Sequence, residues 1–332
     1  MGDLTSRPCV YQRDLAGITE MLLAYRAATG VRAYPTVWRV RLLLTSRVWE
    51  PLQDARVWER APGRIVGLAM LWRRQLSAPY LVLDRFVHPQ DVTRDLVEEM
   101  LRWGCDRAAA IAAEQRIALT LFAGALALDI YADDALGRSG FIPIARNPDG
   151  HNVYFARSLR GHLPIAMLPP GYVLRPLQGV EDLEAYQGLY SFALVHPQHQ
   201  RELLASDEYS HLVVVDSEGG FAAYCECSIC RAEWQIGRER IGWIDYVETR
   251  EDLRRQGLGG AVLFAGLARL RKWGANMGML VTVSTNAPAI RLYAKAGLKR
   301  VHVSEPARYQ KQIALEQDSE SPERSTILPQ PP

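Results

Sequence analysis

The pattern of hydrophobic and polar positions changes its period repeatedly from residue 240 onward. Residues 240–248 read as a strand, and residues 258–273 carry one apolar stripe, as in an amphipathic helix lying on a sheet. The short apolar run 279–284 has the composition of a centrally buried strand. The next helix is predicted to begin at its cap, Asn286, and to end at Gly297, a residue type that accepts a left-handed C-terminal conformation. This strand–helix alternation predicts an α/β domain.

The chain upstream continues the alternation. The pattern predicts a strand at 172–176, helices over 180–204, and strands at 211–216 and 220–233. Before them, residues 159–171 contain three prolines and two glycines, the composition of a linker between domains.

The two sides of this linker resemble each other. Residues 81–89 (LVLDRFVHP) parallel residues 243–249 (WIDYVET), and both stretches lead through a helix, a strand and a second helix to SGFI at 139–142 or AGLK at 296–299. The spacing indicates a tandem repeat with a period of roughly 155 to 160 residues. Chance similarity between two α/β halves is the alternative.

Composition supports two folded units. The chain has 332 residues, 48% of them hydrophobic, enough for two cores. Residues 316–332 are nearly devoid of apolar side chains and are predicted to be a disordered tail. With 39 basic and 37 acidic residues, the net charge of +2 disfavours nucleic acid and membrane surfaces as partners. Residues 1–11 have no cationic start followed by an apolar stretch, and no apolar run reaches 18 residues, so we expect a cytoplasmic protein.

The five cysteines form no recognisable disulfide framework. Cys225, Cys227 and Cys230 could suggest zinc, but their spacing matches a strand in which the first two are small buried hydrophobes and the third lies on the other face. We therefore expect no metal.

One glycine-rich turn carries the clearest chemical signal. Arg254, Arg255, Gln256, Gly257, Leu258, Gly259 and Gly260 follow one another between a predicted strand and a predicted helix. Without side chains at the glycines, backbone N–H groups can approach a phosphate closely, and the helix adds its positive end. The turn predicts binding of an anion such as a pyrophosphate.

These residues resemble the GNAT superfamily of N-acetyltransferases. Arg254, Gly257 and Gly259 match its acetyl-CoA signature, and Asn286, Ala289, Tyr293, Gly297 and Leu298 match its later element. The resemblance covers about residues 172–312 well and the first half only weakly. It implies two tandem GNAT-like three-layer α/β (α+β) domains with mixed central sheets, and acetyl-CoA as the acyl donor.

The resemblance also implies residue roles. The amides of residues 255–260 would hold the pyrophosphate. The main-chain N–H of Val247 would polarise the thioester carbonyl, and Asn286 would touch the pantetheine arm. Tyr293 would protonate the departing thiolate, its alternative role being an aromatic packed in the core.

The general base is harder to assign. Strand alternation is predicted to place Asp245 and Val247 on one face and Tyr246 and Glu248 on the other. Asp245 is the first candidate, followed by Glu248 and Glu226. Each also fits a sheet-edge or solvated carboxylate, and an acceptor amine of low pKa needs only a weak base.

The first half lacks the corresponding signals. Aligned on Val87 and Val247, it has Val97 and Glu99 where the second half has glycines, and counting back from Gly140 places Leu136 at the tyrosine position. We therefore expect residues 1–160 to form a degenerate, non-catalytic domain and residues 161–315 to form the catalytic one.

The predicted activity is transfer of an acetyl group to the amine of a small-molecule or peptide acceptor by direct attack on the thioester. A different acyl group or acceptor, or a non-catalytic acyl-CoA sensor or scaffold, are the alternatives. The sequence allows a monomer or a homodimer.

Overall fold

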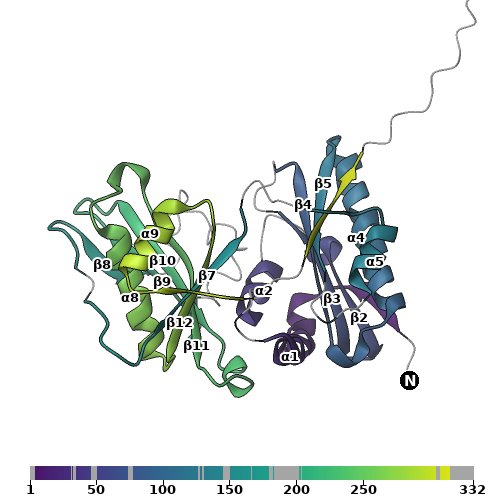
Figure 1. The fold of residues 1–332 in the computed structure, drawn as a ribbon, viewed down its shortest axis with the longest axis horizontal. Coiled ribbons are helices and arrows are strands. Elements are labelled where there is room, and N and C mark those ends of the chain that lie inside the picture. The colour runs from purple at the N-terminus through teal and green to yellow at the C-terminus, as the bar shows by residue number, and fades with distance from the viewer. Residues whose placement is uncertain are drawn as a thin grey trace, which may run out of the picture.

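The structure is a computed structural model and describes residues 4–30, 32, 35–45, 51–73, 78–125, 128, 131–144, 150–165, 167–178, 182, 202, 204–303 and 307–314. Their strands form two seven-stranded mixed sheets with helices packed on them (Figure 1). This α/β arrangement agrees with the fold class predicted from the sequence.

The first sheet has the order β1-β2-β3-β4-β5-β14-β6. Its strands are β1 (Thr5–Pro8), β2 (Ala55–Ala61), β3 (Arg64–Trp72), β4 (Tyr80–Val87), β5 (Leu119–Gly124), β6 (Ile142–Pro143) and β14 (Arg308–Ile313). The helices of this half are α1 (Tyr11–Thr29), α2 (Val37–Leu44), α3 (Pro51–Asp54), the 3-10 turn η1 (Pro89–Asp91), α4 (Arg94–Gln115) and α5 (Ala132–Arg138).

The second sheet has the order β13-β7-β12-β11-β10-β9-β8. Its strands are β7 (Asn152–Ser158), β8 (Val173–Pro176), β9 (Tyr209–Val215), β10 (Phe221–Ile229), β11 (Ile241–Thr249), β12 (Met277–Val283) and β13 (Lys299–Val301). The described helices and turns of this half are η3 (Glu233–Gln235), η4 (Glu251–Leu253), α8 (Leu258–Lys272) and α9 (Ala287–Lys295).

The two sheets repeat one strand order and exchange one strand. In each sheet five strands that follow one another in the chain lie side by side. The sixth strand comes from the other half, and a short strand of the sheet's own half forms the edge beyond it. β14, from the end of the chain, pairs with β5 and β6, whereas β7, which precedes the linker, pairs with β12 and β13. Each half thus completes the other's sheet, and neither half holds all of its own strands once the chain is cut near residue 160.

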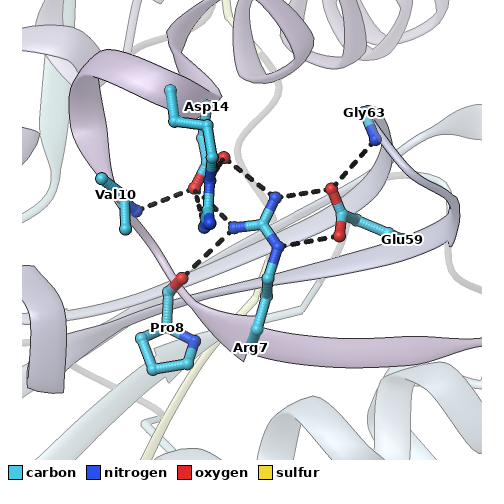
Figure 2. A network of polar contacts seen from close by, with 7 residues as sticks. Arg7, Pro8, Val10, Asp14, Glu59 and Gly63 are labelled. Atoms are coloured by element: carbon cyan, nitrogen blue, oxygen red, sulfur yellow. Dashed lines mark hydrogen bonds and ion pairs between the residues drawn. The ribbon is translucent and has the colours of Figure 1, made fainter.

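A polar network repeats in both halves and marks the tandem relationship. Arg7 of β1 holds Asp14 with two hydrogen bonds of 2.7 and 2.9 Å, and the N–H of Val10 donates to the same carboxylate (Figure 2). Glu59 of the β2–β3 hairpin accepts from the other side of the guanidinium (Figure 2). The network ties β1, α1 and the hairpin together.

The second half repeats the first part of this network. Arg175 of β8 holds Asp182 with hydrogen bonds of 2.5 and 2.8 Å, and the N–H of Gln178 donates to that carboxylate. The spacing of seven residues between Arg and Asp is the same in both halves, each beginning Arg-Pro. This match was not recognised in the sequence and supports the repeat independently of the strands.

Helix α2 belongs to the first half but lies between the two sheets (Figure 1). Val37 and Val40 pack in the core beneath the first sheet, with residues of α1. Trp38 and Leu42 point the other way, into a cluster with residues of β9 and β10. The ring of Trp38 stacks on Tyr209, with centroids 5.3 Å apart. Both faces of one short helix are therefore buried, which joins the halves into one body.

A buried ion pair adds to this junction. Arg26 of α1 pairs with Glu233 of η3 at 2.6 Å, and both side chains are almost fully buried. Glu233 also accepts from the N–H of Val37 at 2.9 Å, at the start of α2. The contact fixes where α2 lies against the second sheet.

Most elements predicted for the second half are present, with small shifts at their ends. The strand predicted over 220–233 is too long, because β10 ends at Ile229 and η3 follows. The predicted tail lies outside the described residues, as do most of the helices predicted over 180–204. No described helix has the length and apolarity needed to cross a membrane.

The cysteines lie where strand alternation predicts. Cys225 and Cys227 pack in the core between the second sheet and α8, and Cys230 packs in a core of the first half. Among the described residues all five cysteines are free, and no group of metal-ligating side chains is found there.

Candidate functional site

Neighbouring strands part in the middle of the second sheet. β11 and β12 pair only over Ile241–Trp243 and Met277–Met279. Beyond Trp243, β11 remains paired with β10 as far as Thr249, while β12 remains paired with β7 as far as Val283. The facing edges of β11 and β12 are thus left without a strand partner at their carboxyl ends. Parting strands at this end of an α/β sheet form the usual place for a ligand.

The backbone of Val247 faces this opening. The N–H of Arg250 donates to the carbonyl of Ala222 at 2.9 Å, so these two residues form a hydrogen-bonded pair of the β10–β11 ladder. Every second residue of β11, counted back from Arg250, then also bonds to β10. Because antiparallel strands alternate, the N–H groups of Val247 and Thr249 point away from β10, toward the edge that β12 has left. The main chain therefore presents donors to the opening.

The predicted glycine turn follows β11 after the short turn η4. Arg255 and Gly257 have positive φ angles of 68° and 90°. No side chain caps α8 and no acidic residue occupies its first turn. A Cβ on Gly259 would come within 3.1 Å of the hydroxyl of Thr249. The first N–H groups of α8 therefore remain open, and such a helix N-terminus fits a phosphate.

The remaining predicted anion-binding residues gather at the same turn. Arg254, Arg255 and Gln256 are exposed, and Gly260 is partly exposed. Arg254 donates to the carbonyl of Thr249 at 3.3 Å, which holds its guanidinium beside the turn. Leu258 differs, because its side chain is in the core and only its main chain lies at the turn.

Helix α9 carries the two predicted residues beyond β12. Asn286 is the N-cap, and its side chain accepts from the N–H of Ala289 at 3.3 Å. Tyr293 is buried among the residues that pack on α8, edge-to-face with Phe155 at 5.7 Å. Burial raises the pKa of Tyr293 to about 12, and the nearby thiol of Cys225 adds to this. The hydroxyl is therefore protonated at neutral pH, as a proton donor must be.

The candidate carboxylates lie on the opposite face of the sheet. Tyr246 is opposite Glu226 but Ile244 is opposite Cys227, so Asp245 is an extra residue, a β-bulge. Both carboxylate oxygens of Asp245 are buried, and they approach the hydroxyl of Ser228, which shares a face with Glu226. The prediction that Asp245 shares a face with Val247 is therefore wrong, because regular alternation does not allow for a bulge.

The bulge places Asp245 on the same face as the two other carboxylates that were separate candidates for the base. Asp245 joins Glu226 and Glu248 on the face that α2 covers. Glu248 accepts a hydrogen bond of 2.9 Å from the hydroxyl of Tyr224. His211 of β9 lies 3.7 Å from Glu226 and stacks on the ring of Tyr224.

Burial controls the ionisation of this cluster. It raises the pKa of Asp245 to about 6, against the opposing effects of Ser228 and Arg39. It raises the pKa of Glu226 to about 8, with the charge of Asp245 adding to the effect. Burial also lowers the pKa of His211 to about 3, so that imidazole is neutral. The pKa values of the two carboxyls therefore lie on either side of neutral pH, the range in which a general base operates.

Two groups in this cluster were missed in the sequence. Arg39 of α2 donates to the hydroxyl of Tyr246 at 3.1 Å, and its guanidinium lies 5.5 Å from the centre of that ring. Nothing in the local sequence indicates this contact, since Arg39 comes from the first half. His211 was missed because only cross-strand pairing places it beside Glu226.

The equivalent region of the first half is arranged differently. β4 and β5 pair over Tyr80–Leu83 and Thr120–Ala123 and then part as well. There the side chain of Arg85 bridges the strands, donating to the carbonyl of Gly124 at 2.7 Å.

The helix that follows β4 also differs from α8. The hydroxyl of Thr93 caps α4 by accepting from the N–H of Leu96, and Asp95 lies in its first turn. Val97 and Leu136 are fully buried in the core. The open amides and the tyrosine of the second half have no counterpart among these described residues.

Comparisons with known proteins agree with the resemblance. Residues 180–298 match the acetyltransferase (GNAT) family. A mycothiol acetyltransferase from Pseudarthrobacter chlorophenolicus is 28% identical over 155 residues, 42% of this chain and 46% of that protein. One from Saccharomonospora viridis is 30% identical over 161 residues, 45% of this chain and 53% of that protein. The match spans about half the length of these curated relatives.

A solved structure extends the likeness to both halves. The tandem GNAT protein from the clavulanic acid biosynthesis pathway superposes with a TM-score of 0.62 at 19% identity, over 94% of this chain and 99% of that chain. At that identity the likeness is one of fold. Residues 180–298 thus match a GNAT acetyltransferase-family model, and the fold of the two halves together is similar to that of a tandem GNAT protein.

Proposed function

We propose that the protein is an acetyl-CoA-dependent N-acyltransferase whose single active site lies in the second half. The observation that carries the proposal is the parting of β11 and β12 directly before the uncapped glycine turn. The gap between the strands offers a place for the extended pantetheine arm of acetyl-CoA. The turn offers open amides for the phosphates of the same molecule.

In this proposal each predicted residue has a part in holding the donor. The amides of residues 255–260 would bind the pyrophosphate, with charge from Arg254 and Arg255. Asn286, at the start of α9, would contact the pantetheine arm. The N–H of Val247 points to the opening and would stabilise negative charge on the thioester oxygen. Acetyl-CoA itself supplies the activated acyl group.

The acid and base candidates lie on the two sides of this opening. Tyr293 lies on the face of the second sheet that α8 and α9 cover. Asp245, Glu226 and Glu248 lie on the face that α2 covers. An amine that approaches from the α2 side would lose its proton to the carboxylate cluster, while the thiolate would receive a proton from Tyr293. We propose Asp245 as the base, because a pKa of about 6 leaves it ionised at neutral pH.

The acceptor proposed is an amine of a small molecule or peptide. An ionised Asp245 on the α2 face favours a ligand that arrives as an ammonium ion. A weak base such as Asp245 suits an amine with a pKa near 8, about a tenth of which is free at neutral pH. We further propose that the first half neither binds CoA nor catalyses, since Arg85 and the capped α4 occupy the corresponding places.

Two measurements test the function. Calorimetry of the full chain with acetyl-CoA is expected to show binding, and a thiol-release assay over an amine panel is expected to identify a substrate. The panel covers α-amines, lysine-like amines and mycothiol-related amines, given the names of the matched relatives. Binding without thiol release would favour the sensor alternative, and turnover with another acyl-CoA would change the donor. Absence of any CoA binding by folded protein would reject the proposal.

Tyr293→Phe is expected to lower turnover about 100-fold without changing the affinity for acetyl-CoA. The change removes the proton donor but keeps the ring that packs on Phe155. Activity should not vanish, because a thiol with a pKa of about 8.5 leaves readily near neutral pH. Steady-state kinetics with calorimetric Kd values checks this, and an unchanged kcat would leave Tyr293 with a packing role only.

A further inference from the structure

Arg39 lies at the meeting point of the two halves. Its helix is fixed from both sides, since Val37 and Val40 enter the first core while Trp38 and Leu42 enter the cluster on the second sheet. Arg39 projects between these contacts and donates to the Tyr246 hydroxyl at 3.1 Å. The first half therefore places a cation on the face that bears the candidate base.

The surroundings of this cation are mostly acidic or phenolic. The second sheet contributes side chains from three strands, which are Tyr209 and His211 of β9, Tyr224 and Glu226 of β10, and Asp245, Tyr246 and Glu248 of β11. The first half contributes Asp84 and Arg85 of β4, and the exchanged strand β14 contributes Arg308. Asp84, Glu226 and Asp245 all feel the charge of Arg39.

We propose that Arg39 is a positioning residue of the second half's active site, which stabilises the ionised carboxylate of Asp245 and fixes Tyr246 beside it. The base role of Asp245 rests on the proposed function, whereas the hydrogen bond from Arg39 to Tyr246, the neighbour of Asp245 in β11, does not. The degenerate half is then more than a scaffold, because it completes the site of its partner half.

The physical reason is the cost of burying carboxylates. Both oxygens of Asp245 and one of Glu226 are inaccessible to water. Burial raises the pKa of Asp245 to about 6 and that of Glu226 to about 8, and Arg39 opposes the rise in both. A nearby opposite charge commonly shifts a carboxyl pKa by about 1 unit or more. Without Arg39, less of Asp245 would be ionised at neutral pH.

The test compares Arg39→Met with Arg41→Met in the full chain. Arg41 is on the same helix and lies over the ring of Trp38, 5.5 Å from its centre, so its removal controls for loss of a cation and of packing. Melting temperatures are measured from pH 5 to pH 9. Because the folded-state pKa values are raised, the carboxyls' contribution is full when they are protonated and is lost as the pH rises through about 6 and 8.

The loss of stability with rising pH should be larger in Arg39→Met than in wild type. Relative to wild type, Arg39→Met is expected to be destabilised about 2 °C more at pH 9 than at pH 5, which corresponds to about one pKa unit. Arg41→Met should show the same difference from wild type at every pH. Arg39→Lys keeps the charge and should restore the wild-type pH dependence even if its melting temperature is lower.

A pH-independent effect of Arg39→Met, parallel to that of Arg41→Met, would overturn the inference. If Arg39→Met does not fold, Arg39→Gln serves in the same comparison. Once an acceptor is known, the apparent pKa of kcat/KM should rise by about one unit in the variant. Failure of acetyl-CoA binding would reject the proposed function but leave the stability result standing, so the two outcomes can be told apart.

Discussion

Gly260→Asp is expected to weaken acetyl-CoA binding about 100- to 1,000-fold while leaving the protein as stable as wild type or more so. Gly260 is the third residue of α8, and a Cβ there would meet its nearest neighbour, the side chain of Leu292, only at 3.9 Å. A carboxylate in the first turn is favourable for a helix, by about 0.3 to 1 kcal/mol. The same carboxylate would occupy the open amides and repel a pyrophosphate, so affinity and stability should move in opposite directions.

Gly260→Ala is the matched control. It adds the Cβ without the charge and improves helix propensity by about 1 kcal/mol. Its melting temperature should rise while its affinity, measured by calorimetry, stays within a few-fold of wild type. Equal affinity of wild type and Gly260→Asp would show that the phosphates of CoA do not lie at this turn.

The parts of the site that could be predicted from sequence are local. Gly257 has a φ of 90° and Asn286 caps α9, and both features follow from residue type and near neighbours. The strands that flank the turn were predictable because buried strands read as apolar runs. The prediction of anion binding by the turn therefore needs only a short stretch of chain.

The rest depends on contacts between distant segments. The bulge at Asp245 depends on how many residues of β10 oppose β11, which neither strand specifies alone. The exchange of β7 and β14 depends on two sheets assembling together, and the position of Arg39 depends on α2 fitting between them. The repeated Arg–Asp pairs, in contrast, are visible in the sequence once the structure shows which spacing to compare.

On the proposed function, the tandem arrangement lets one half lack a CoA site of its own and still contribute to the site of the other half. On the Val87–Val247 alignment, which does not allow for the bulge, Arg85 has the sequence position of Asp245, and its side chain bridges the parted strands. Strand exchange and the buried Arg26–Glu233 pair keep the halves together. The first half can then supply Arg39 to a site that it does not itself possess.

Asp245→Asn is expected to lower kcat/KM about 1,000-fold, within the usual range for loss of a general base. The amide keeps the shape of the side chain but cannot accept the proton of the amine. Wild-type kcat/KM should rise with pH around 6, the pKa to which burial raises Asp245, and the residual activity of the variant should lack this rise.

The melting temperature gives a second readout, and Asp245→Asn is expected to raise it although the same change lowers kcat/KM. The raised pKa means that wild type loses the contribution of Asp245 as the pH rises from about 4 through 6, so Asp245→Asn should gain melting temperature relative to wild type between pH 4 and pH 8. Glu226→Gln should show a similar gain at higher pH, because burial raises that pKa to about 8. A moderate loss of rate is expected there, since the two carboxyls titrate together.

Glu248→Gln distinguishes the remaining candidate. Glu248 already accepts from the hydroxyl of Tyr224, and the amide oxygen can accept the same bond. Its kcat/KM should stay within about 10-fold of wild type, less than the loss of a base causes. If Glu248→Gln proved inactive while Asp245→Asn remained active, the base would be Glu248, and Asp245 would have only a structural place beneath α2.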